Sequence, residues 1–217
     1  MADAAIEQVV AERLYTAVIG DILDELGYVN QFLPASVRPM QPGMRVTGRA
    51  MPVQLAAATK VRGRGFDTLV AALDALQPGE VYVASGGHIE CAAWGELMTV
   101  AARGRGAAGA VLNSYHRDTE RILEQGWPVF SHGPYAQDAA VRSIVVDHRV
   151  SIDVDGVDVT PGDLLVGDID GVLVVPHAVE EEVLALAVAK ARAESRVRAA
   201  IENGASATDA FKEFGVL

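Results

Sequence analysis

Apolar residues recur at helical spacing near the start of the chain. Within residues 5–27 they fall three or four positions apart, which predicts two short helices. Thr16 is a possible N-cap for the second helix, and Gly27 is expected to end it. Three prolines then disfavour a helix, and residues 45–55 are predicted to be an extended segment that begins the core.

The middle of the chain alternates between helical and extended patterns. Strands and helices of similar length follow one another, which is typical of an α/β layer. The predicted fold class is therefore α/β. Helices are predicted over residues 66–76, 94–105 and 117–125, and strands over residues 81–85, 109–112 and 128–130.

Beyond Val141 the apolar residues follow the two-residue period of strands, with Asp155-Gly156 as a hairpin turn. Two more apolar runs flank a turn signal at residues 168–171. A long helix is predicted from residue 178 to about residue 203, and a short one over residues 206–214. Since no internal repeat or low-complexity linker interrupts the pattern, we expect one domain with helical ends.

Composition narrows the function classes. The chain has 217 residues, half of them hydrophobic, which suffices for one sizeable core. Its formal charge of -11 argues against general nucleic-acid binding, because phosphates are negatively charged as well. Cys91 is the only cysteine, so an intrachain disulfide framework is excluded. The first residues lack the basic start of a signal peptide, and no apolar run approaches a membrane span, so we expect a cytoplasmic protein.

Candidate chemistry gathers at two predicted strand-to-helix junctions. Residues 95–98 open one predicted helix, and Arg117-Asp118 follow the next strand. Free backbone N–H groups at a helix start can hold a carboxylate or an enolate oxygen, and Arg117 offers a planar fork of donors. Asp118 offers hard oxygen ligands for magnesium, and Glu96 could hold the waters of that metal.

Several patterns also have plainer interpretations. Taken alone, an Arg-Asp pair at a helix start is more often an ion pair than a site. Gly104-x-Gly106-x-x-Gly109 follows a helix and precedes a strand, the reverse of a dinucleotide loop, so packing or capping is favoured. Asp168 and Asp170 are expected to form a turn rather than a calcium site. Isolated histidines are usually structural, and among them His116 is the best functional candidate.

Specific motifs carry a family resemblance. They are the WGEL run at residues 94–97, an acid-x20-Arg-Asp pattern formed by Glu96 with Arg117 and Asp118, PVFSHG at residues 128–133, and PGDLLVGDIDGVLVVP at residues 161–176. With these motifs the chain resembles the RraA-like family, which includes class II 4-hydroxy-4-methyl-2-oxoglutarate aldolases and the regulator of ribonuclease activity A. The resemblance covers nearly the whole chain.

The resemblance implies a swivelling β/β/α domain over residues 1–217, with mixed sheets flanked by helices. It implies a homotrimer or a homohexamer with active sites between subunits, and a divalent cation, Mg²⁺ or Mn²⁺. By the same resemblance, Arg117 binds a 2-oxo acid and Asp118 ligates the metal directly. The substrate loop that it implies consists of Gly95, Glu96, Leu97 and Met98.

The implied activity is that of a lyase acting on a small di- or tricarboxylic 2-oxo acid. Breaking the bond next to a ketone leaves a pyruvate enolate, whose charge Mg²⁺ and Arg117 can stabilise. Oxaloacetate decarboxylation gives the same enolate, and Glu96 is the candidate to position the base. Residues 113–116 and the glutamate at position 96 depart from the family pattern. These departures predict a substrate different from that of the best-known family members. The alternative is a non-catalytic, protein-binding regulator.

Overall fold

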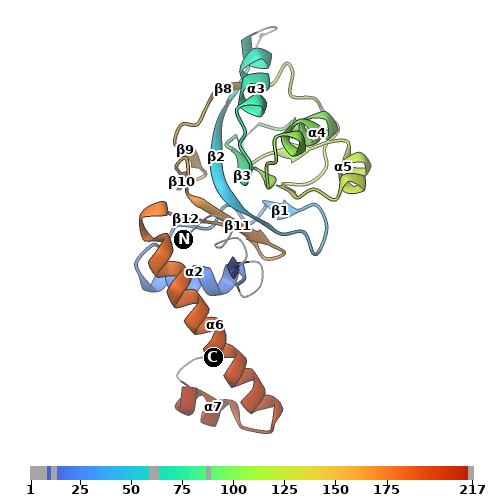
Figure 1. The fold of residues 1–217 in the computed structure, drawn as a ribbon. Coiled ribbons are helices and arrows are strands. Elements are labelled where there is room, and N and C mark those ends of the chain that lie inside the picture. The colour runs from blue at the N-terminus through green and yellow to red at the C-terminus, as the bar shows by residue number, and fades with distance from the viewer. Residues whose placement is uncertain (1–8, 11–13, 59–63, 87–88, 215–217) are drawn as a thin grey trace.

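A mixed β-sheet forms the centre of the molecule in the computed structural model, which describes residues 9–10, 14–58, 64–86 and 89–214 (Figure 1). Strands follow the order β1-β7-β5-β3-β2-β11-β12, and β8 pairs with β2 beside this path. The predicted α/β class with mixed sheets flanked by helices is confirmed. The strands are β1 (Arg38–Pro39), β2 (Val46–Ala57), β3 (Glu80–Ala84), β5 (Gly109–Leu112), β7 (Val129–Ser131), β8 (Ser143–His148), β11 (Leu164–Asp168) and β12 (Gly171–Val175).

The long strand β2 joins the two halves of the sheet. It pairs in parallel with β3 through residues 49–53 and in antiparallel fashion with β11 through residues 46–49. Its far end pairs with β8, with an irregular register between Gln54 and Leu55. One strand therefore connects the parallel α/β part to the antiparallel, β-rich part that the change of period predicted.

Three helices cover one face of this sheet: α3 (Arg64–Asp74), α4 (Glu96–Gly104) and α5 (Thr119–Gln125) (Figure 1). They enclose a core in which Trp94 stacks on Trp127, with ring centroids 5.9 Å apart and an interplanar angle of 9°. A second core lies on the opposite face of the sheet. It includes the hairpin of β9 (Ile152–Val154) and β10 (Val157–Val159).

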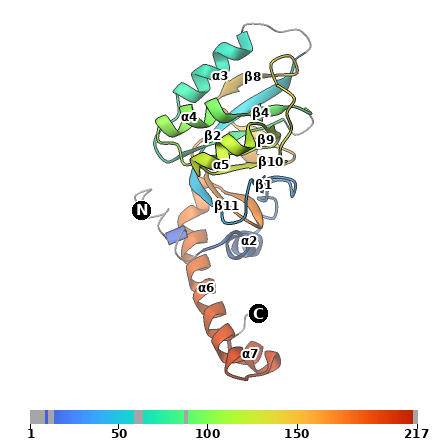
Figure 2. The ribbon, with the colours of Figure 1, turned by 90° about the vertical axis from the view of Figure 1, so that its right-hand side faces the viewer.

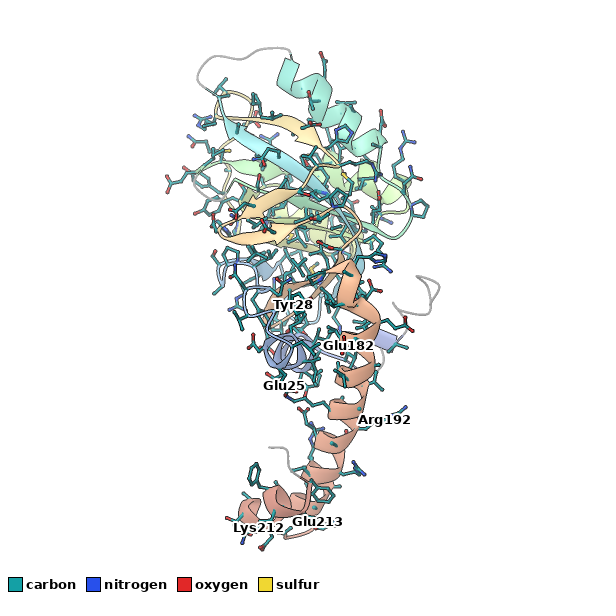
Figure 3. The ribbon with its side chains drawn as sticks, turned by 90° about the vertical axis from the view of Figure 1, so that its left-hand side faces the viewer. Glu25, Tyr28, Glu182, Arg192, Lys212 and Glu213 are labelled. Atoms are coloured by element: carbon teal, nitrogen blue, oxygen red, sulfur yellow. The ribbon has the colours of Figure 1, made fainter. Side chains whose placement is uncertain are left out.

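Helices α2 (Thr16–Glu25) and α6 (Glu180–Glu202) pack against β11 and β12 in a third core. Helix α6, which follows the single turn η1 (His177–Val179), then extends away from the sheet and ends beside α7 (Ala207–Phe214) (Figure 2). In Figure 3, Glu25 of α2 lies beside the upper part of α6. The described residues contain no helix long and apolar enough to cross a membrane.

Several element boundaries differ from the predictions. Trp94 lies in the short strand β4 (Ala92–Trp94), so α4 begins two residues later than expected. Helix α5 likewise begins at Thr119 rather than at residue 117, because residues 115–116 form the unpredicted strand β6 (Tyr115–His116). Pairing between β4 and β6, which no local period reveals, holds Trp94 and His116 extended, and the left-handed backbone of Asp118 delays the start of α5 to Thr119.

The ends of α2 confirm one prediction and correct another. Gly27 has a φ of 88°, and the N–H groups of Gly27 and Tyr28 bond carbonyls of the last helical turn, so the predicted stop is confirmed. Thr16 caps no helix, because its hydroxyl donates to Asp168 Oδ1 at 2.7 Å, and Tyr15 is the N-cap. Of the first predicted helix, the described part is residues 9–10, which are helical.

The glycine pattern at residues 104–109 and the acidic pair Asp168 and Asp170 have the structural roles that the sequence favoured. Gly109 packs against β2, where a Cβ atom on it would lie 2.6 Å from Val46 Cγ2. Asp168 ends β11 just before the turn at residues 169–170, and its carboxylate accepts hydrogen bonds from Thr16 and from the Asp170 N–H. The glycine pattern therefore serves packing, and the acidic pair forms a turn.

Candidate active site

The small parallel sheet of β4 and β6 brings the candidate residues together. Its register pairs Ala92 with Tyr115 and Trp94 with His116, and each strand leads directly into a helix. Parallel strands end at the same edge of a sheet, which is where ligands usually bind in α/β folds. The loop before α4 and the loop before α5 consequently lie side by side.

Asp118 connects these two loops through an unusual backbone conformation. Its φ of 60° and ψ of 36° lie in the left-handed region, which aspartate tolerates better than most residues. The carboxylate makes no cap on its own helix α5. Instead, Asp118 Oδ2 accepts the backbone N–H of Glu96 at 3.1 Å. Asp118 therefore supplies the side-chain acceptor for the first amide of the neighbouring helix α4.

Gly95 permits this close approach. A Cβ atom at position 95 would lie 2.7 Å from Asp118 Oδ2 and 3.6 Å from Arg117 Cγ. The first distance is shorter than real side chains allow, so any larger residue would displace the carboxylate. The glycine of the WGEL run is thus explained by contact with the Arg-Asp pair rather than by a turn.

Arg117 lies between two carboxylates. Its Nε is 3.8 Å from Asp118 Oδ2, and its Nη1 is 3.3 Å from Asp138 Oδ1. All three side chains are close to half exposed, so water screens these ion pairs and each contributes little free energy. The guanidinium is consequently available to a ligand carboxylate that can displace Asp138.

Two hollows meet at Arg117 and Asp118. The smaller has a volume of about 430 Å³ and is bordered by Thr119 and residues 134–136. The larger has a volume of about 550 Å³ and extends between α3, the start of α4 and residues 138–145. Gly95, Leu97 and Met98 line the larger hollow, whereas Glu96 lines neither. The structure thus brings five of the six candidate residues to one cavity, and Glu96 contributes its backbone amide.

His116 lies behind the pair and fixes its loop. The ring is buried; its Nδ1 shares a hydrogen bond with Ser131 Oγ at 2.7 Å, and its Nε2 shares one with Thr119 Oγ1 at 3.1 Å. Burial lowers the pKa of His116, which favours the neutral ring. These bonds tie the first residue of α5 to β7, so the histidine supports the loop that carries Arg117 and Asp118.

Neighbouring residues 113–116 shape the other border of the site. The Tyr115 ring lies 5.4 Å from those of both His132 and Tyr135, and His132 Nε2 is 2.8 Å from Asn113 Oδ1. Tyr115 therefore belongs to an aromatic wall beside the smaller hollow, which Tyr135 lines. Of the other isolated histidines, His88 lies outside the described residues.

Asp138 is a site residue that the sequence did not reveal. It lies in a loop, its backbone bridges to Ala92 of β4, and its side chain lines the larger hollow. No period or spacing distinguishes it from other surface aspartates. Only the pairing with β4 places it against Arg117.

The donor set fits a divalent cation held by one protein carboxylate. Among the described residues, no group of three or more His, Cys, Asp or Glu side chains could hold a metal ion. Asp118 is half exposed, and its contacts with Arg117 and Glu96 engage Oδ2, so its carboxylate would be the group that holds such a cation. Mg²⁺ suits such a place because it retains several waters and uses one or two carboxylates.

Known proteins resemble this chain along most of its length. A family model described as RraA-like, Aldolase/RraA, matches residues 16–174. Protein DlpA of Legionella pneumophila is 30% identical over 200 residues, which are 92% of this chain and 32% of that protein. The chain thus spans about a third of DlpA. A Halalkalibacterium halodurans protein named "Putative 4-hydroxy-4-methyl-2-oxoglutarate aldolase" is 34% identical, with 87% of this chain and 85% of that protein covered.

Solved structures share the fold as well. The crystal structure of Streptomyces coelicolor RraAS2, described as an unusual member of the RNase ES inhibitor RraA protein family, matches with a TM-score of 0.83. The two chains are 26% identical, and the match covers 91% of this chain and 98% of the other. The family model covers well over half of the sequence, and the β4–β6 site carries two of the motifs that suggested the resemblance, the WGEL run and the Arg117-Asp118 pair. This chain belongs to the RraA-like family.

Proposed function

We propose that this chain is a divalent-metal-dependent lyase that cleaves a carbon–carbon bond of a small 2-oxo acid through a pyruvate enolate. Its activity would be that of a 4-hydroxy-4-methyl-2-oxoglutarate-type aldolase with oxaloacetate decarboxylase activity. The observation that supports the proposal best is the convergence of Gly95, Arg117 and Asp118 at one cavity. The aldolase name of the H. halodurans relative supports the same reaction class.

The proposed reaction assigns a task to each group. Arg117 binds the carboxylate of the 2-oxo acid through its planar fork. The first amides of α4, at Leu97 and Met98, stabilise the charge that develops on the 2-oxo oxygen. Glu96, whose side chain lines neither hollow of this chain, would position a water that removes the proton of the 4-hydroxyl. The C3–C4 bond then breaks, its electron pair remains on C3, and protonation of C3 gives pyruvate.

Asp118 would hold Mg²⁺ or Mn²⁺, with water and substrate oxygens in the other positions. When bound, the cation would supply a Lewis acid that polarises the 2-oxo group and lowers the cost of the enolate charge. Gly95 and the Glu96 amide keep the Asp118 carboxylate at the cavity. Their role is therefore to fix the ligand before the cation arrives.

We further propose that residues 1–217 act as one RraA-like domain in a homotrimer or homohexamer, with the site completed between subunits. The half-exposed side chains of Arg117 and Asp118 leave room for a neighbouring chain at this cavity. Residues 113–116 and Glu96 would then alter the substrate relative to the family pattern.

The test is pyruvate release from oxaloacetate and from 4-hydroxy-4-methyl-2-oxoglutarate. Arg117→Ala should lower kcat/KM by about 100-fold or more, because the carboxylate and the developing charge lose their partner. Arg121→Ala is the matched control, since this arginine on α5 is exposed and pairs with Glu124. Near-normal kinetics of Arg117→Ala would refute the proposed mechanism.

A second candidate function is a non-catalytic, protein-binding regulator. The similarity to RraAS2, whose description names the RNase ES inhibitor family, favours it. Binding of a partner protein that survives Asp118→Asn, in a chain that turns over neither compound, would support the regulator. Turnover that depends on Asp118 would support the lyase.

A further inference from the structure

His116 connects two borders of the smaller hollow. Its backbone N–H donates to the Gly133 carbonyl at 3.1 Å, and its carbonyl accepts the Tyr135 N–H at 2.8 Å. Its buried ring shares a hydrogen bond with the Thr119 hydroxyl. Thr119 and Tyr135 both line the hollow, together with Arg117. The ring of His116 therefore fixes the Thr119 hydroxyl at the border of the hollow.

The other partner of the ring indicates the direction of these hydrogen bonds. Ser131 Oγ accepts the Gly133 N–H at 3.1 Å and lies 2.7 Å from His116 Nδ1. A hydroxyl that already accepts one bond is satisfied when it donates its own proton, and a neutral imidazole accepts at one nitrogen and donates from the other. With Nδ1 as the acceptor, Nε2 carries the ring proton and donates it to Thr119 Oγ1. The Thr119 hydroxyl then donates its proton away from the ring.

The two hollows offer different groups to the two ends of a dicarboxylic substrate. Asp138, which a ligand carboxylate would displace from Arg117, lines the larger hollow, whereas Thr119 lines the smaller one. Asp118, the proposed metal ligand, lines both. A molecule with its first carboxylate at Arg117 and its oxo group near Asp118 can therefore extend into the smaller hollow, whose volume of about 430 Å³ accommodates a second carboxylate.

We infer that Thr119 binds the distal carboxylate of a 4-hydroxy-2-oxo diacid, through a hydroxyl that His116 and Ser131 orient. The inference rests on the proposed function and names a residue that selects its dicarboxylic substrate. A hydroxyl suits this task because hydrogen bonds to a charged acceptor are stronger than those between neutral groups. Thr119 would touch the substrate, whereas His116 is a positioning residue that acts through Thr119.

Two substrates that differ only in the distal group test the assignment. Wild type, Thr119→Val and Thr119→Ser, each with Mg²⁺, are assayed for pyruvate release from 4-hydroxy-2-oxoglutarate and from 4-hydroxy-2-oxopentanoate, in which a methyl group replaces the distal carboxylate. Thr119→Val keeps the shape and removes the hydroxyl, so kcat/KM for the dicarboxylate should fall by about tenfold or more, mainly through KM. The value for the methyl compound should change by less than about twofold. Thr119→Ser retains the hydroxyl and should keep the wild-type ratio of the two values.

Thr208→Val is the matched control, because Thr208 lies in the exposed first turn of α7 and lines neither hollow. It should leave both kcat/KM values unchanged. An unchanged ratio in Thr119→Val, or an equal loss for both compounds, would overturn the assignment. Light scattering measures the mass of each variant in solution. A mass of Thr119→Val that differs from that of wild type would show that this hydroxyl bonds a neighbouring chain, which also overturns the assignment.

The tautomer of His116 tests the orienting role independently of activity. Nitrogen-15 NMR distinguishes a ring proton on Nε2 from one on Nδ1, because the two nitrogens are chemically distinct. The ring signal that moves in Thr119→Val identifies His116, since its Nε2 loses its partner there. We predict a proton on Nε2 in the wild type, and a proton on Nδ1 would overturn the proposed orientation of the Thr119 hydroxyl.

Oxaloacetate distinguishes failure of this inference from failure of the proposed function. Its decarboxylation requires only the enolate-forming groups at Arg117 and Asp118. Wild-type turnover of oxaloacetate, together with an unchanged substrate ratio in Thr119→Val, would overturn the role of Thr119 and leave the proposed function standing. Failure of the wild type to release pyruvate from any of the three compounds would overturn both.

Discussion

At the scale of single residues, the site depends on a contact that only glycine allows. Gly95 lets the Asp118 carboxylate reach the first amide of α4, and Asp118 adopts a left-handed backbone conformation to do so. Such strained conformations persist where the surrounding structure holds them in place, and they concentrate at functional sites. Here the Arg117 N–H, bonded to the Trp94 carbonyl at 3.0 Å, anchors the preceding residue.

Gly95→Ala should displace the Asp118 carboxylate and weaken the apparent Mg²⁺ affinity by about tenfold or more, comparable to loss of a group that orients a metal ligand. The measurement is the Mg²⁺ dependence of pyruvate release from oxaloacetate. Gly104→Ala is the control, because a Cβ atom there meets nothing within 4 Å. Wild-type Mg²⁺ dependence in Gly95→Ala would contradict the described geometry.

Asp138→Asn should lower KM for oxaloacetate by about two- to fivefold. The change removes a screened, half-exposed ion pair with Arg117, an interaction of about 0.5–1 kcal/mol, and frees the guanidinium for the substrate. The control Asp158→Asn alters an exposed aspartate on β10 that does not line this cavity. An unchanged or higher KM would show that Asp138 does not compete with the substrate for Arg117.

Most of the candidate site could be predicted from the sequence, since the WGEL run and the Arg-Asp pair share a recognisable spacing. Asp138 and the apolar lining of the larger cavity could not, because Phe66 and Val141 resemble ordinary surface residues locally. Their role depends on α3 and the loop after residue 133 meeting at β4.

At the scale of elements, strand β4 and strand β6 show why boundaries were missed. Each is two or three residues long, too short for a period of its own, and each continues into a helix whose apolar spacing extends across the junction. The long helix α6 was predicted well, because its pattern is long and its start is marked by acidic residues.

The start of α6 is also held by an ion pair that no pattern predicts. Glu180 is buried and receives both Nη atoms of Arg49 on β2, with Nη2 3.1 Å from Oε1. Glu180→Ala should lower the free energy of unfolding by about 2–3 kcal/mol, below the full cost of breaking a buried pair because Arg49 retains some solvent contact.

Chemical denaturation measures this effect. Glu181→Ala is the matched control, since this neighbouring glutamate in the same turn of α6 is exposed. Equal stability of the two variants would mean that the pair contributes little to anchoring α6.

At the scale of the whole molecule, the alternation of strands and helices predicted the fold class but not the strand order. The position of β2 between β3, β8 and β11 depends on pairings between residues far apart in sequence, and local periodicity contains no information on these. The family resemblance added a swivelling β/β/α domain with mixed sheets, and the strand order comes from the structure alone.

Two histidines, the buried His116 and the part-buried His132, link the stability of the fold to pH. Desolvation lowers the pKa of His116. It also lowers the pKa of His132, where it outweighs the opposite effect of the nearby Asp155 carboxylate. The unfolded chain therefore takes up protons first as the pH falls below about 6.5, so stability present above that pH is lost as the pH falls through the folded pKa values.

His132→Gln should reduce the loss of Tm between about pH 7.5 and about pH 5.5, because glutamine keeps a donor for Asn113 and does not titrate. Thermal unfolding at the two pH values measures this. His177→Gln, which removes a largely exposed histidine, is the control and should behave as the wild type. If His132→Gln loses as much Tm as the wild type between these pH values, His132 does not cause the pH dependence of stability.

The central claim is that Asp118 makes this site a metal-dependent source of pyruvate enolate. It is tested most directly by pyruvate release from oxaloacetate with Mg²⁺ and with EDTA, corrected for the rate without protein, in wild type and Asp118→Asn. Asparagine tolerates the left-handed backbone and retains the fold without the charge. We predict turnover that EDTA abolishes and that the variant loses by about 100-fold or more. Turnover that survives both EDTA and Asp118→Asn would contradict the account.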